Sequence, residues 1–147
     1  MSTGKHGSAE WTITYDDAQG GTARAVTPYV QTISGLKITS AMQIITAFGD
    51  SWEKSSPTGV KKVDPVTIHG FFDDTATVGP HVVFLTPDTT AYDGTTSTSR
   101  TLVVVVSNSS KTFTVETLLM SYSVLGKTGN LTEYEAVIQP TSTGTWS

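Results

Sequence analysis

Apolar and polar side chains alternate with a period of two in several short segments of the chain, and turn-forming residues separate these segments. In residues 9–15, for example, Trp11, Ile13 and Tyr15 alternate with polar residues, which is the pattern of a half-buried β-strand. Similar extended segments are predicted over 22–35, 37–46, 60–72, 102–106, 112–124 and 133–139. We therefore expect a mainly β fold, an antiparallel β-sandwich or partial barrel.

Some segments depart from plain alternation in ways that suggest their place in the fold. Residues 102–106 are apolar at every position, which predicts a central strand. Residues 112–124 and 133–139 are separated by turn-forming residues and predict the two arms of a hairpin. Pro80 suits the first position of a helix and Pro87 would end it, so we expect one short flanking helix.

The apolar pattern disappears between Gly49 and Gly59, apart from Trp52. We expect a long inter-strand loop over about 46–60, and a loop of this length inside a compact domain is more often functional than idle. The predicted organisation is a flexible N-terminus over 1–8, a single domain over 9–139 and a C-terminal arm over 140–147.

Composition supports the β prediction and excludes several classes of protein. The 147 residues include 27 Thr and 16 Ser, and branched residues such as Thr and Val favour strands over helices. Thirteen acidic against nine basic residues give a net charge of −4, which argues against gripping nucleic acid through its phosphates. The absence of cysteine excludes a disulfide framework and thiolate metal sites.

Neither a membrane span nor an export signal is expected. The longest apolar run, Leu102–Val106, is far shorter than the roughly 20 residues that cross a bilayer. The segment Met1–His6 lacks the apolar region of a secretory signal, so we expect the protein to stay in the compartment where it is made. The glycosylation patterns at Asn108 and Asn130 are then interpreted as chance matches.

No catalytic or cofactor-binding constellation is found. His6, His69 and His81 do not share a metal-ligand spacing, and no Gly-x-Ser-x-Gly elbow or phosphate-binding loop is present. The adjacent aspartates of the chain are more typical of turn caps than of acid–base catalysis. The loop from Asp88 to Asp93 could bind calcium only loosely, because it lacks the alternating carboxylates of a calcium loop. We therefore expect neither an enzyme nor a cofactor.

Three segments carry a signal of another kind. They are Thr-Ala-Phe-Gly-Asp at 46–50, Gly-Phe-Phe-Asp-Asp at 70–74 and Gly-Lys-Thr-Gly-Asn-Leu at 126–131. Their order and spacing resemble those of the major tail tube proteins of long-tailed, non-contractile (siphovirus-type) bacteriophages, over roughly residues 10–139. Asn130 stands where that family usually has an acidic residue.

The resemblance implies a small β-sandwich flanked by one helix, and a structural function in the virion. Such subunits close into six-membered rings that stack into a tube, assembled in the host cytoplasm and then part of the virion tail. The implied partners are further copies of the chain, a tape-measure protein, and tail terminator and distal tail proteins. DNA would pass through the tube without specific binding.

The resemblance also suggests roles for particular residues. The long loop would contact the neighbouring ring through Ile44, Ile45, Phe48, Asp50, Trp52 and Lys54, although local packing beneath the loop is the alternative. The motif that closes a core strand consists of Gly70, Phe71, Phe72, Asp73 and Asp74. Candidate lumen carboxylates, which would repel DNA, are Asp64, Glu116, Glu133 and Glu135, with ordinary solvent-facing charge as the alternative. In the C-terminal arm, Trp146 would anchor on a neighbour.

Two other functions are compatible with the sequence. A β-sandwich carbohydrate-binding or adhesion module could use Trp11, Trp52 and Trp146 as a stacking platform. A tail terminator or a secretion-tube ring protein would share the expected fold.

Overall fold

The computed structural model describes residues 11–106, 111–142 and 144–147. The predicted flexible N-terminus over 1–8, His6 and the Asn108 glycosylation pattern lie outside these residues.

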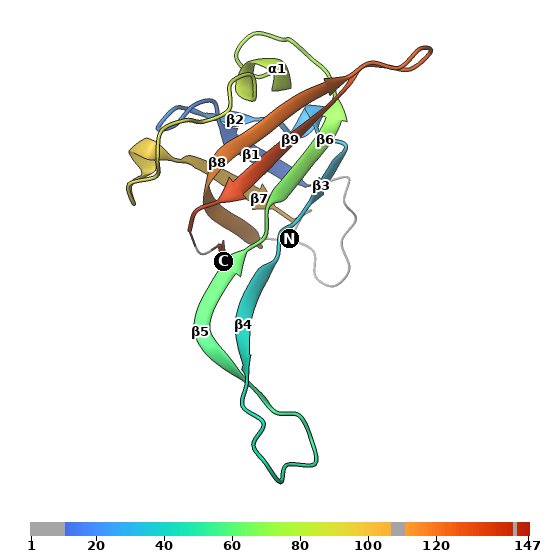
Figure 1. Cartoon of the computed structure of the whole chain (residues 1–147). Coiled ribbons are helices and arrows are strands. Elements are labelled where there is room, and N and C mark those ends of the chain that lie inside the picture. The colour runs from blue at the N-terminus through green and yellow to red at the C-terminus, as the bar shows by residue number, and fades with distance from the viewer. Residues whose placement is uncertain (1–10, 107–110, 143) are drawn as a thin grey trace.

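Eight strands form one antiparallel sheet, and two further strands form a separate hairpin (Figure 1). The sheet contains β1 (Thr12–Asp16), β2 (Ala23–Ala25), β3 (Thr32–Ser34), β6 (Val66–Phe71), β7 (Arg100–Val105), β8 (Thr112–Leu125), β9 (Glu133–Pro140) and β10 (Thr145–Trp146). Their order is β2-β1-β7-β8-β9-β6-β3, and β10 pairs with β8. The separate hairpin consists of β4 (Ile38–Ile44) and β5 (Ser55–Val63). The expected mainly β, antiparallel fold is confirmed, and β7 is central, between β1 and β8.

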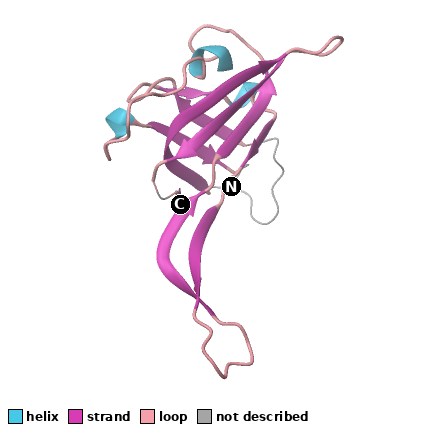
Figure 2. Ribbon diagram, viewed as in Figure 1, coloured by secondary structure: helices cyan, strands magenta, loops and turns pink. Residues whose placement is uncertain are grey.

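The sheet folds over a core, with β6, β8 and β9 in one layer and β1, β2 and β7 behind them (Figure 2). Strict alternation directs every second residue inward, as in β9, where Tyr134, Ala136 and Ile138 are fully buried. The largest fully buried side chains are Tyr15, Phe84, Phe113, Tyr134, Ile68, Leu102, Leu119 and Ile138.

Helical segments are short, as expected. The α-helix α1 (Pro80–Val83) begins with a proline at its first position, and two 3-10 turns, η2 (Thr27–Tyr29) and η3 (Thr96–Thr98), complete the described helical structure. Phe84, directly after α1, enters the core, where its ring stacks on Tyr15 at 5.4 Å between centroids and on Tyr134 at 5.9 Å. The helix therefore closes one end of the core.

A buried ion pair holds the segment after α1 to the sheet. The side chains of Arg100 and Asp88 are each 4% exposed, and Arg100 Nη2 lies 2.8 Å from Asp88 Oδ1. Arg100 also donates to the carbonyl oxygens of Val83 and Thr86 at 2.8 and 3.1 Å, while Asp88 Oδ2 accepts from the backbone N–H of Leu119 at 2.8 Å. Charged groups are buried at a cost unless they are paired and hydrogen-bonded, as they are here. This pair was not predicted from the sequence.

Three predicted boundaries need correction. The segment 60–72 is not one strand, because it is divided at Asp64 and Pro65 into β5 and β6. The long loop is shorter than the predicted 46–60, because β5 begins at Ser55 and pairs with β4. The C-terminal arm is also shorter than predicted, because Pro140 belongs to β9 and residues 145–146 pair with β8 as β10.

Replacing Arg100 with Leu tests the buried ion pair. Asp88 would be left buried without its partner, which costs about 3–5 kcal/mol of unfolding free energy. For a domain of this size each kcal/mol lowers Tm by about 2–4 °C. The matched control is Arg24→Leu, which breaks the more exposed Arg24–Asp17 pair (3.0 Å) and should cost less than about 1 kcal/mol. Thermal unfolding followed by circular dichroism compares the two, and equal losses of stability would contradict this account.

Candidate functional site

The β4–β5 hairpin projects from the folded body of the subunit (Figure 1). Its register runs from Ile38 opposite Val63 to Ile44 opposite Ser55, with an irregularity between Ser40 and Met42. In the described structure, β4 and β5 pair only with each other and not with any strand of the large sheet. An isolated two-stranded hairpin is marginally stable in water. This segment therefore lacks the third element that normally supports a ribbon of this length.

Large apolar side chains on this hairpin are exposed. Phe48 is fully exposed and Trp52 is 81% exposed, both at the tip. The apolar residues of the hairpin that are exposed are Ile38, Met42, Ile44, Ile45, Phe48, Trp52 and Val60, and we refer to them as the hairpin surface. Large apolar side chains exposed together on one element are typical of interaction sites. Four of these residues were predicted from the sequence, and the alternative that they pack beneath the loop is wrong for this subunit.

Asp50 and Lys54, also predicted as contacts, organise the tip loop itself. Asp50 Oδ2 accepts from the backbone N–H of Ala47 at 2.7 Å, and Asp50 Oδ1 lies 3.2 Å from Lys54 Nζ. Gly49 has a φ of +91°, which a side chain would strain. The Thr46 hydroxyl accepts from the Lys54 N–H at 2.8 Å. These interactions hold the loop in a form that presents Phe48 and Trp52 to solvent.

The first residues of the Gly70–Asp74 motif pack the end of β6 against Tyr29 and against His81 of α1. A Cβ at Gly70 would collide with the carbonyl oxygen of Tyr29, which itself accepts from the Tyr134 hydroxyl at 2.9 Å. The Phe72 ring contacts the His81 ring at 5.1 Å. This part of the motif is structural.

The rest of the motif divides between a turn and the surface. Asp73 accepts from the N–H and hydroxyl of Thr75, and these hydrogen bonds hold the pKa of the Asp73 carboxyl below its usual value. Phe71 and Asp74, by contrast, are exposed. The motif therefore contains one turn cap and two solvent-facing side chains.

The candidate lumen carboxylates do not all lie on one surface. In β9, Glu133 and Glu135 alternate with buried residues and point outward, and Glu133 Oε2 lies 3.4 Å from His69 Nε2. Glu116 points outward from β8. Asp64 is instead in the turn between β5 and β6, 3.9 Å from Lys37 Nζ. The structure thus brings three of the four onto the outward face of the large sheet, and which face lines a lumen stays a prediction.

Hydroxyl groups engage the carboxylate of Glu116. It accepts from the Ser99 hydroxyl at 2.6 Å and from the Thr101 hydroxyl at 2.9 Å. Nearby, burial raises the pKa of the Asp16 carboxyl, and the charge of Glu116 adds to the shift. Glu116 therefore belongs to a local polar network, whereas Glu135 is exposed on β9.

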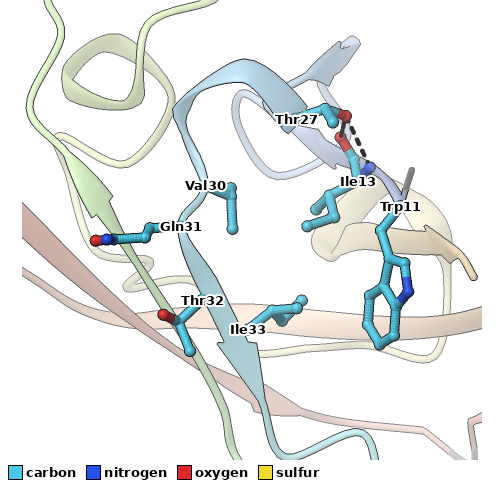
Figure 3. A pocket seen from close by; sticks show the side chains of 7 residues that line it. All are labelled: Trp11, Ile13, Thr27, Val30, Gln31, Thr32 and Ile33. Atoms are coloured by element: carbon cyan, nitrogen blue, oxygen red, sulfur yellow. Dashed lines mark hydrogen bonds between the residues drawn. The ribbon is translucent and has the colours of Figure 1, made fainter. Parts of the chain in front are cut away.

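A pocket of about 460 Å³ lies where η2 and β3 approach β1 (Figure 3). Trp11, Ile13, Val30 and Ile33 line it with apolar side chains, and Thr27 Oγ1 accepts from the Ile13 N–H at 2.9 Å. Among the residues that the structure describes, this pocket is lined by apolar and uncharged polar side chains.

The three tryptophans do not form one stacking platform. Trp52 is at the hairpin tip, and Trp146 in β10 packs its ring against Phe113 of the same chain, at 5.0 Å. Trp11 precedes β1, which is separated from β10 by β7 and β8. This arrangement removes the feature that favoured a carbohydrate-binding module. A contact between Trp146 and a neighbouring subunit stays a prediction.

The carboxylates at the two ends of the 88–93 loop are engaged within the protein. Asp93 Oδ1 accepts from Thr95 and Thr98, so, like Asp88, it is engaged within the protein. Within residues 11–106, 111–142 and 144–147, no group of three or more His, Asp or Glu side chains is placed to bind a metal ion. None of the helices described is long and apolar enough to span a bilayer.

Comparison with known proteins identifies the fold. No protein-family model and no curated protein matches the chain. A chain in the tail of an empty gene transfer agent (GTA) particle with C6 symmetry is 12% identical, with a TM-score of 0.69 over 97% of this chain and 99% of that one. A chain in the six-fold symmetrised baseplate of the anti-feeding prophage is 10% identical, with a TM-score of 0.70 over 100% and 97%. A chain in the native GTA virion is 12% identical, with a TM-score of 0.66 over 97% and 99%. The chain thus has the fold of subunits found in six-fold symmetric phage-like tails.

Proposed function

We propose that this chain is a structural subunit of a phage-type tail, which closes into six-membered rings that stack into a tube. The observation that carries the proposal is the exposed apolar hairpin surface on a fold shared with subunits of C6-symmetric tails. The three sequence segments at 46–50, 70–74 and 126–131 support the long-tailed, non-contractile kind of tail. The protein would act in the virion tail after assembly in the host cytoplasm.

Ring closure would use the edges of the large sheet. The terminal strands β2 and β3 each have one edge without a partner in the described sheet. Strand β8 also extends past β7, which pairs with it only from Thr112 to Thr117. Unpaired sheet edges invite pairing with another chain, and a head-to-tail contact closes into a ring when its rotation permits. Pairing between neighbours would satisfy these edges.

Stacking would use the hairpin surface. Burying an apolar side chain contributes about 1.5–3 kcal/mol for residues the size of Leu or Phe. Phe48 and Trp52 gain none of this within the subunit, because they are exposed at the tip. Their burial against the neighbouring ring would therefore favour stacking.

The same role accounts for the acidic outward face of the sheet. A tube that conducts DNA must not bind it, and carboxylates repel phosphate. The proposed function is non-catalytic. Its partners are further copies of this chain, a tape-measure protein, and the terminator and distal proteins that end the tube.

One alternative role shares the fold. The match to a chain from the anti-feeding prophage baseplate favours, as a second candidate, a ring protein at the end of a tail or of a secretion tube. Electron micrographs of the purified protein over a range of concentrations separate the two, because a tube protein forms filaments and a terminal ring protein stops at single rings.

Replacing Phe48 and Trp52 together with Ser tests the stacking role. Both side chains are exposed, so we expect unchanged Tm, but loss of filaments because the apolar contact is gone. Glu53→Ser is the matched control, since it changes an exposed charged residue of the same loop and should leave filaments intact. Filaments of normal length in the F48S/W52S variant would refute the role of the hairpin.

Replacing Glu135 with Lys tests the repulsion of DNA. Glu135 is exposed on the outward face, so the variant should assemble normally while its tube attracts phosphate and slows genome ejection. Glu135→Gln, which removes the negative charge without adding a positive one, should have a smaller effect. Ejection is followed by release of dye-accessible DNA from particles that carry each variant. Equal ejection rates for particles that carry the wild-type protein, the Glu135→Lys variant and the Glu135→Gln variant would show that this face does not line the channel.

A further inference from the structure

A second exposed apolar surface lies at the end of the subunit opposite the β4–β5 hairpin (Figure 1). It surrounds the β8–β9 turn, and its large apolar residues are between 42% and 70% exposed. They are Phe71, Leu125 and Leu131, which we call the receiving surface.

Strand register brings these residues together. Glu133 in β9 pairs with Phe71 on one side and with Leu125 on the other, so the three lie abreast across β6, β9 and β8. Leu131 precedes β9 by two positions, and the backbone N–H of Phe72 donates to the Thr132 carbonyl at 2.8 Å. Phe71 and Leu125 therefore share one face of the sheet, and the turn that carries Leu131 is tied to the end of β6.

The charges near the two surfaces are of opposite sign. On the hairpin, Asp50 is paired with Lys54. The remaining charges are Glu53 in the tip loop and Lys61 and Lys62 toward the base of β5, so the net charge is positive. The receiving surface contains Lys127 in its turn and is flanked by two carboxylates, those of exposed Asp74 and of Glu133, which lies 3.4 Å from His69 Nε2, so its net charge is negative. Complementary charges guide association and set its orientation.

We propose that the hairpin surface of one copy docks on the receiving surface of a second copy, in the next ring. This inference rests on the proposed function and names the partner surface that stacking requires. A heterologous contact uses two different patches of the same chain, and it propagates along an axis when the patches lie at opposite ends. The two surfaces described here have that placement, and both are apolar with complementary charged borders.

A mixing experiment tests this pairing. The F48S/W52S variant keeps its receiving surface, whereas an L125S/L131S variant keeps its hairpin surface. We expect each variant alone to form rings that do not stack. Mixed together, they should form particles of twice the mass of one ring, because one intact surface of each kind remains. Mass is measured by analytical ultracentrifugation, and circular dichroism verifies that both variants are folded.

The outcomes separate this inference from the function on which it rests. Filaments formed by L125S/L131S, but not by F48S/W52S, would overturn the receiving surface and leave the stacking role of the hairpin in place. Filaments formed by both variants would overturn the stacking role itself. A mixture that stays at the mass of single rings would also overturn the pairing, because the two defects would not be complementary.

Charge reversal provides a second test that leaves the apolar residues intact. A K61E/K62E variant should lose filaments by repulsion from Asp74 and Glu133. Adding D74K and E133K to the same chain should restore them, because the attraction is re-established with the signs exchanged. Failure of the four-fold variant to assemble, when K61E/K62E is defective and both are folded, would contradict the pairing.

Discussion

A two-stranded ribbon has no surface on which to bury its own apolar side chains, and this constraint governs what the molecule can do. The β4–β5 hairpin leaves the sheet and exposes Phe48 and Trp52 at its tip, while Asp50 and Lys54 keep the tip loop ordered. Water is an unfavourable environment for such a surface. In the proposed function, a further copy of the same chain supplies the burial that this hairpin lacks within the subunit.

The body of the subunit, in contrast, is complete in itself. Its alternating strands enclose aromatic residues such as Tyr15, Phe84 and Tyr134, and the Arg100–Asp88 ion pair fastens the segment after α1 to the sheet. Core stability and assembly are thereby separated, since the residues that hold the fold together are buried while those proposed to join subunits are exposed. Such a division allows assembly surfaces to change without unfolding the subunit.

Regular alternation made most of the sheet predictable, because one buried face leaves a period of two in β1, β8 and β9. Alternation did not predict the first part of β5, because both faces of the hairpin are exposed there. Residues 55–59 therefore show no alternation of apolar and polar side chains, and the sequence predicts a loop. The Arg100–Asp88 pair was also missed, because a buried charge pair leaves no local signal in either partner. The apolar residues Ile44, Ile45, Phe48 and Trp52 could be singled out from the sequence and are exposed, whereas the receiving surface depends on register between β6, β8 and β9 that the sequence does not reveal.

The most direct measurement is hydrogen–deuterium exchange of the backbone amides over residues 38–63, in dilute subunits and in assembled particles of the same protein. If the hairpin is completed by another copy, these amides exchange quickly in the subunit and become strongly protected on assembly, while protection of β7, which is paired on both sides within the subunit, stays the same. Equal protection of the hairpin in both samples, with assembly confirmed by particle mass, would contradict this account.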